Sequence, residues 1–183
     1  MSPTRSFRRL GRDRSGVAAL EFALILPVMA LMLMGMIEVF SLIQAYGKAL
    51  SAAQTVSDLT SRAESQTTAS MDAVVTGAQA VLYPLPGDAS KLGVRVASVG
   101  ISSAGQPVLL WSYSWGGSAP SIDIAKAVGL APNGQSVIMV ASRYVHESPL
   151  QYVLGDVAMN YSAVSRPRVV RLISYNGSTG TLP

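Results

Sequence analysis

The sequence predicts an α+β protein in which a long N-terminal helix crosses a membrane and a small domain follows it. Three observations predict this class. Residues 17–40 are almost entirely apolar, residues 41–62 continue with a helical repeat of small apolar residues, and several short runs beyond residue 92 have the composition of strands. The chain has 183 residues. That length suffices for one membrane anchor and one domain of about 100–120 residues.

The apolar run carries no charge between Glu21 and Glu38. As a helix, residues 17–37 span about 31 Å, which is roughly the hydrocarbon thickness of a bilayer. Pro27 lacks a backbone N–H and therefore predicts a kink or a loosened turn inside this helix. Gly35 offers a point of close approach for another helix. Both residues also occur in membrane helices that have no such role.

Five arginines stand before the apolar run. Against the single acidic residue of this segment they account for the whole formal net charge of +4, so the chain from Val17 onward is neutral. Arginines directly before a membrane helix indicate a cytoplasmic N-terminus and a C-terminal domain on the far side of the membrane. This position favours a membrane leader over the alternative, a nucleic-acid-binding arm. The five are Arg5, Arg8, Arg9, Arg12 and Arg14.

Beyond the apolar run the sequence predicts further helices and then strands. An amphipathic helix continues the first one up to about Arg62. Its expected buried stripe is Leu42, Tyr46, Ala49, Ala53, Val56, Leu59 and Ala63, and its expected exposed side is Gln44, Lys48, Ser51, Gln54, Ser57 and Arg62. A shorter helix over 71–82 ends before Pro84. Strands are expected over 93–102, 108–115, 137–144 and 160–165, with a short helix capped by Ser121 over 121–130.

These elements predict four parts of the chain. They are a basic leader at 1–16, a transmembrane helix at 17–40, an amphipathic extension at 41–64 and an extracytoplasmic α+β domain at 65–183.

The sequence predicts no enzyme, no metal site and no cofactor. The chain has no cysteine, which excludes thiolate zinc ligands and thiol nucleophiles. Its one histidine, His146, lacks the clustered ligands of a zinc site and the G-x-S-x-G context of a hydrolase, so we expect a surface residue. A membrane-tethered hydrolase using His146 is the least favoured alternative. Trp111, Tyr113 and Trp115 alternate on one strand, and we expect the buried face of a sheet rather than a platform for stacking sugars.

Glu21 is the residue that points to function. A charged group within a membrane helix costs about 2.5–3.5 kcal/mol at the bilayer centre and less near the edge. Glu21 either extends back to water or meets a cation inside the membrane. A free α-amino group, made by cutting a neighbouring copy just upstream of the helix, would be such a cation.

The residues around Glu21 resemble a known family. Gly16 is separated by four residues from Glu21 and Phe22, behind a basic segment and before an apolar helix. This arrangement resembles the prepilin-peptidase site of type IV pilin-like proteins. The stretch RSGVAALEFALILPVMALMLMGMIEVF is similar to the N-terminus of TadE-like minor pilins, or pseudopilins, of the tight-adherence (Tad/Flp) pilus system. The similarity includes Leu26-Pro27, Gly35-Met36-Ile37-Glu38 and, near the C-terminus, Ser165-Arg166-Pro167-Arg168.

The resemblance implies that a prepilin peptidase cuts after Gly16 and leaves Val17 as the new N-terminus. Glu21, with Phe22 beside it, would pair with the Val17 amine of an adjacent subunit. Pro27 and Gly35 would shape and pack the helix, and Glu38 would lie at the membrane boundary.

The resemblance also implies a place and partners. The chain would be a single-pass protein of the bacterial inner membrane with a periplasmic C-terminal domain, and it would be incorporated into the surface pilus. Its partners would be the peptidase, other pilin and minor pilin subunits, the assembly platform and the lipid bilayer, with a role in pilus assembly, surface attachment or biofilm formation. The alternative is an uncleaved, membrane-anchored binding protein of the cell envelope.

Overall fold

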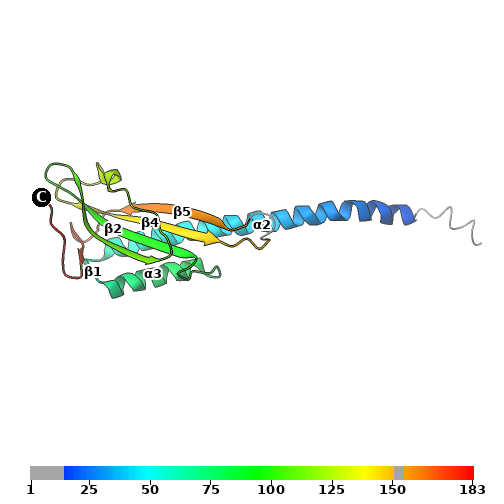
Figure 1. Cartoon of the computed structure of the whole chain (residues 1–183), viewed down its shortest axis with the longest axis horizontal. Helices are drawn as coiled ribbons and strands as arrows, with labels where there is room; N and C mark the ends of the chain where they lie inside the picture. The colour runs from blue at the N-terminus through cyan, green and yellow to red at the C-terminus, as the bar shows by residue number, and fades with distance from the viewer. Residues whose placement is uncertain (1–14, 151–154) are drawn as a thin grey trace, which may run out of the picture. The chain divides into compact units, whose positions relative to one another are not determined.

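The computed structural model describes residues 15–150 and 155–183 (Figure 1). The chain divides into two compact units, Met1–Phe40 and Ser41–Pro183, and helix α2, Ser15–Arg62, runs through the division. The other described elements all belong to the second unit. They are β1 Ser65–Gln66, α3 Thr68–Leu82, β2 Leu92–Ile101, β3 Pro107–Gly116, the 3-10 helix η1 Ile124–Ala127, β4 Ser136–His146, β5 Val157–Ser165 and β6 Ser174–Tyr175.

The second unit contains a four-stranded antiparallel sheet, which with the two α-helices confirms the predicted α+β class. The strand order is β3-β2-β4-β5, and β1 and β6 form a separate parallel pair. The central strands β2 and β4 are buried along most of their length. Edge strand β5 instead alternates between exposed and less exposed residues, as a strand with one open face does.

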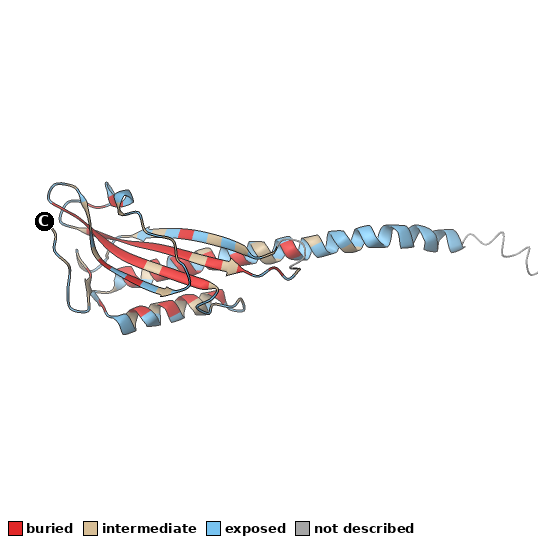
Figure 2. Cartoon of the chain, in the orientation of Figure 1, coloured by how far each residue is buried: buried red, intermediate tan, exposed pale blue. Residues whose placement is uncertain are grey.

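One face of the sheet is covered by helix α3 and by the part of α2 that follows Phe40 (Figure 2). Side chains from both helices and all four strands form a single apolar core there. The contribution of α2 consists mostly of alanines, and small side chains let a helix approach a sheet closely. The buried residues of α2 in this core are Ala45, Ala49, Ala52, Ala53 and Val56.

The stripe predicted for this part of α2 is only partly right. Tyr46 is 55 % exposed and Leu59 is also exposed, whereas Ser57, expected outside, is buried. Tyr46 lies beside the alanine stripe, where its ring meets Tyr161 of β5 edge to face at 5.4 Å between ring centroids. Ser57 is buried because its hydroxyl donates to Ser165 Oγ at 2.8 Å, which satisfies its hydrogen-bonding need inside the core.

Helix α3 begins earlier than the expected residue 71. Thr67 caps it, since its hydroxyl accepts from the Ser70 backbone N–H while the Ser70 hydroxyl accepts from the Thr67 N–H. This reciprocal capping box satisfies two N–H groups that a helix start leaves free.

On the second face of the sheet, the described residues form a smaller cluster at one end, under η1. Val99, Val137 and Met139 meet Ala127 and Ala131 there. The expected short helix is a single 3-10 turn, and its cap is Asp123 rather than Ser121, because the Asp123 carboxylate accepts from the Ala125 N–H at 3.1 Å.

The aromatic residues of β3 belong to the main core, which confirms the prediction of a buried face. Trp111 is 7 % exposed, donates its indole N–H to the Ile173 carbonyl at 2.7 Å and stacks on Tyr175. The Tyr113 hydroxyl donates to Asp72 Oδ1 at 2.5 Å. Burial, together with this bond, raises the pKa of Tyr113. These rings fasten the C-terminal segment and α3 to the sheet and present no open stacking platform.

Candidate membrane and subunit interface

The first unit exposes the apolar side chains of α2 almost without exception (Figure 2). Within the described residues, Gly16–Arg62 is one helix that is long and apolar enough to cross a membrane. Exposed apolar surface of this extent indicates lipid or another protein as its natural surroundings. The large exposed side chains include Val17, Leu20, Phe22, Leu24, Ile25, Leu31, Met32, Ile37 and Phe40.

Glu21 lies on this helix one turn beyond Val17. Residues at this spacing have their Cβ atoms about 5–6 Å apart on one side of a helix. Glu21 is exposed and forms no hydrogen bond or ion pair within residues 15–150 and 155–183. Continuing in steps of three and four along α2, the same stripe carries Leu24, Val28 and Gly35. The acid and the small residue therefore share a side of the helix.

The fold itself does not require Gly16 or Gly35 to be glycine. Among the residues that the structure describes, a Cβ atom added at either position would meet nothing within 4 Å. Neither has the positive φ that favours glycine elsewhere in the chain. The contacts of the described residues therefore give no reason for glycine at these two positions, whereas a peptidase that recognises Gly16 or a helix that packs against Gly35 would.

Pro27 does not end the helix. α2 is helical both before and after Pro27 and continues to Arg62. The kink expected at Pro27 and the packing role of Phe22, which is exposed, remain predictions.

Glu38 differs from Glu21 in its surroundings. It is 2 % exposed and does not lack a partner. A carboxylate this buried needs a polar partner. Its role at the membrane boundary remains a prediction, as does that of the leader, because Arg5, Arg8, Arg9, Arg12 and Arg14 lie outside the described residues.

His146 is not the surface residue that we expected. It is the last residue of β4, is 4 % exposed, and its Nε2 lies 3.2 Å from the hydroxyl oxygen of Ser41 on α2. The error arises because this contact joins residues 105 positions apart, which no local pattern shows. A Ser–His pair also occurs in hydrolases, but there the hydroxyl must face substrate. The burial of His146 favours a structural role, fastening the end of β4 to α2.

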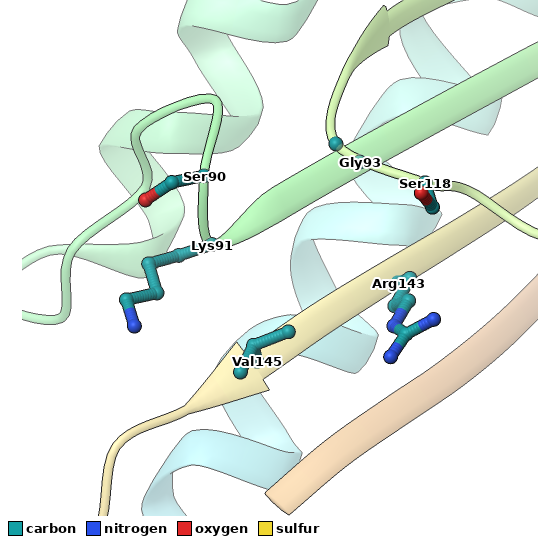
Figure 3. A pocket seen from close by; sticks show the side chains of 7 residues that line it. Ser90, Lys91, Gly93, Ser118, Arg143 and Val145 are labelled. Atoms are coloured by element: carbon teal, nitrogen blue, oxygen red, sulfur yellow. The ribbon is translucent and has the colours of Figure 1, made fainter. Parts of the chain in front are cut away.

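A hollow of about 200 Å³ lies where β2 begins and β4 ends, lined by residues that include Lys91, Ser118 and Arg143. Figure 3 shows Lys91 and Arg143 on either side of Val145. Lys91 is already paired with Glu147, and their hydrogen bond raises the pKa of Lys91. Lys91 is therefore neutralised by Glu147 rather than free to hold an anion in the hollow. Among the described residues, no group of three or more His, Asp or Glu side chains could hold a metal ion.

The candidate site residues that the structure describes therefore lie on the N-terminal half of α2. Residues 16–58 match the protein family described as TadE-like protein. These residues form a TadE-like domain. The matched region begins at Gly16 and ends within α2, so it includes Glu21, Pro27, Gly35 and Glu38. The comparison with curated proteins and the comparison with solved structures each found no match.

The TadE-like domain coincides with the helix that can span a membrane. The strands and α3 lie outside the matched residues. The family match therefore describes the anchor and its extension, and the sheet domain has to be understood from its own structure.

Proposed function

We propose that this chain is a minor pilin, or pseudopilin, of a tight-adherence type IV pilus. A prepilin peptidase removes residues 1–16, and the new N-terminus at Val17 stays at the cytoplasmic side of the inner membrane. Residues 17–40 span the membrane, and the sheet domain lies in the periplasm. The subunit then joins other pilins through its membrane helix. It takes part in pilus assembly, surface attachment or biofilm formation.

The observation that supports this proposal best is an exposed acid, Glu21, on an uncovered apolar stretch of helix, five residues after a glycine that the described contacts do not require. Glu21 would accept the amine that cleavage creates on Val17 of an adjacent subunit. At about 4 Å and an effective dielectric constant of about 20, this attraction is about 4 kcal/mol before desolvation is subtracted. That magnitude offsets the cost of about 2.5–3.5 kcal/mol for an acid deep in the membrane. The pair therefore favours one register between neighbouring helices.

Cleavage is tested by mass spectrometry of the protein's N-terminus in its native host. The unchanged protein should begin at Val17, and Gly16→Leu should accumulate as the longer, uncut form. Gly11→Leu, the same change within the leader, is the matched control and should be cut normally. A mature protein that retains its arginines would overturn the proposal in favour of the uncleaved binding protein.

The pairing role is tested separately with Glu21→Gln, which keeps the shape of the side chain and removes its charge. Cleavage should continue, but the amount of subunit recovered with pili should fall about tenfold or more, since each 1.4 kcal/mol of lost pairing is a factor of ten. Glu64→Gln, an exposed acid beyond α2, is the control. Recovery of Glu21→Gln in normal amounts would remove the pairing role.

A further inference from the structure

Strand β5 is an open edge of the sheet. It pairs with β4 only, and the register between the two strands runs from Ile138 opposite Ser165 to His146 opposite Val157 without a shift. The backbone hydrogen bonds that the described residues form outside helices and ladders include none from residues 157–164. Half of the peptide groups of an edge strand point away from its neighbour. Those of β5 therefore have no backbone partner within the described chain.

This edge also lacks the features that usually protect one. Natural edge strands are blunted by charged residues, prolines or bulges, because an open, regular edge recruits further strands. The sequence of β5, VAMNYSAVS, contains no charge and no proline, and β5 has no bulge. The opposite edge, β3, begins with Pro107 and has a register shift opposite Ser98 and Val99. The C-terminal segment also lies against β3, since a Cβ added at Gly180 would be 3.0 Å from the Leu110 backbone.

Two hollows flank the same part of β5, one on each face of the sheet. Both are lined by Ser162, Ala163 and Val164. The hollow toward α2 has about 330 Å³ and a mixed wall, with the polar side chains of Gln54 and Asp58 beside the apolar side chain of Leu50. The hollow toward η1 has about 150 Å³, and apolar side chains form much of its wall, among them Ile122, Leu130 and Met139. A strand added at this edge would direct alternate side chains to the two hollows.

We propose that the β5 edge binds an extended, uncharged strand from a different pilus subunit. Main-chain hydrogen bonds to residues 157–165 supply affinity, and the two hollows supply specificity. The bound strand places an apolar side chain in the hollow beneath η1 and small or polar side chains toward α2. This inference rests on the proposed function, because it takes its partner from the same assembly.

A second copy of this chain does not fit the edge in the same way. Two identical edges that pair symmetrically run antiparallel about a two-fold axis. β5 runs in the same direction as α2, because Tyr161 reaches the Tyr46 carbonyl and, farther along both elements, Ser165 reaches Ser57. A symmetric pair would therefore direct the two α2 helices oppositely. The proposed function instead gives every copy the same direction across one membrane.

The chain has no cysteine, so an engineered cysteine is its only thiol and reports on one chosen position. Ser162→Cys places it on the β5 edge. Ser114→Cys is the matched control, because Ser114 and Ser162 are both exposed and lie on opposite edges of the sheet. The two serines belong to one row of paired residues, in which Ser162 lies opposite Ala141, Ala141 opposite Arg95, and Arg95 opposite Ser114. The rate of maleimide alkylation is compared between pilus-assembling cells and the full-length protein in detergent. Assembly should slow labelling of Ser162→Cys about tenfold or more, as for a site that is nine-tenths occupied, and leave Ser114→Cys unchanged.

A photo-reactive maleimide on the same cysteine identifies the partner. The expected cross-link joins residue 162 to an uncharged, extended segment of a different subunit. Equal protection of both cysteines, no protection of Ser162→Cys, or a cross-link to a second copy would each contradict the proposal. N-terminal sequencing of the same samples separates the two proposals. A chain that begins at Val17 and stays unprotected refutes only the edge site, whereas an uncut chain refutes the proposed function.

Val164→Lys tests the edge without a label. Val164 is 47 % exposed, so a lysine there can be accommodated in the isolated fold while placing a charge on the edge. Cleavage after Gly16 and the thermal unfolding temperature should stay unchanged, and recovery with pili should fall at least severalfold. Ser114→Lys should leave all three unchanged. Normal recovery of a folded Val164→Lys protein would refute the edge site.

Discussion

Tyr144 and Tyr161 are buried tyrosines on neighbouring strands that differ in what their hydroxyl groups contact. The Tyr161 hydroxyl donates to the Tyr46 carbonyl at 3.2 Å, whereas the buried Tyr144 hydroxyl has no hydrogen-bond partner among the described residues. Burial raises the pKa of both to about 12. Replacing either tyrosine with phenylalanine removes only its hydroxyl group, in each case from a buried side chain. The two substitutions should therefore differ in the sign of their effect on stability.

The magnitudes follow from the hydrogen bonds. Tyr161→Phe loses one bond and should destabilise the second unit by about 1 kcal/mol, within the usual range of about 0.5–1.5 kcal/mol. Tyr144→Phe removes a buried hydroxyl without a partner, a group whose burial costs about 1–3 kcal/mol, so the variant should be as stable as the natural protein or more stable by about 1 kcal/mol. The difference of about 2 kcal/mol corresponds to roughly 5 °C in unfolding temperature for a unit of this size.

The assay is thermal unfolding of the full-length protein in detergent, followed by tryptophan fluorescence. Trp111 and Trp115 are the two tryptophans of the chain, and both lie on β3, so the signal reports the sheet domain rather than the membrane helix. Equal destabilisation by the two substitutions would refute the reasoning, because it would mean that the Tyr144 hydroxyl has a partner in solution.

Three further predictions concern the same domain. Ser98→Ala should raise the unfolding temperature by a few degrees, since the buried Ser98 hydroxyl also has no hydrogen-bond partner within residues 15–150 and 155–183. A lower temperature in the same fluorescence assay would contradict this. Gly93→Ala should destabilise the domain by about 1–3 kcal/mol, because its Cβ would lie 2.5 Å from the Gly117 carbonyl oxygen. Gly129→Ala is the control, because a Cβ there meets no neighbour among the described residues and the substitution tests only the strain of a positive φ. The pKa values of the buried tyrosines Tyr113, Tyr144 and Tyr161 are raised above the unfolded value of 10.0, so their contribution to stability is complete below pH 10. It is lost as the pH rises through about 12 for Tyr144 and Tyr161, and the pKa of Tyr113 is raised as well. Phenolate absorbance should therefore show these tyrosines titrating together with unfolding, and separate titration of all tyrosines near pH 10 in the folded protein would disprove it.

Local patterns in the sequence were enough for the two α-helices and the four strands of the main sheet, but not for η1 or the short pair β1 and β6. The extent of α2 follows from an apolar run that passes into a helical repeat without a breaker, and α3 ends where prolines follow. The strands follow from short β-branched and aromatic runs. Gly16, Glu21 and the leader arginines could be selected in the same way, because an acid in an apolar run is conspicuous without any knowledge of the fold.

The tertiary structure decided which residues each element buries. The helical repeat of α2 is compatible with a buried stripe that includes either Tyr46 or its neighbour Ala45. The alanines are the buried residues, because the helix lies close to the sheet. The burial of His146 depends on Ser41, far away in the sequence. The strand order, which leaves β5 open while the C-terminal segment lies against β3, likewise comes from non-local pairing. Periodicity shows that a residue has a preferred side, but only the assembled chain shows what lies on that side, because packing joins segments that no local pattern relates.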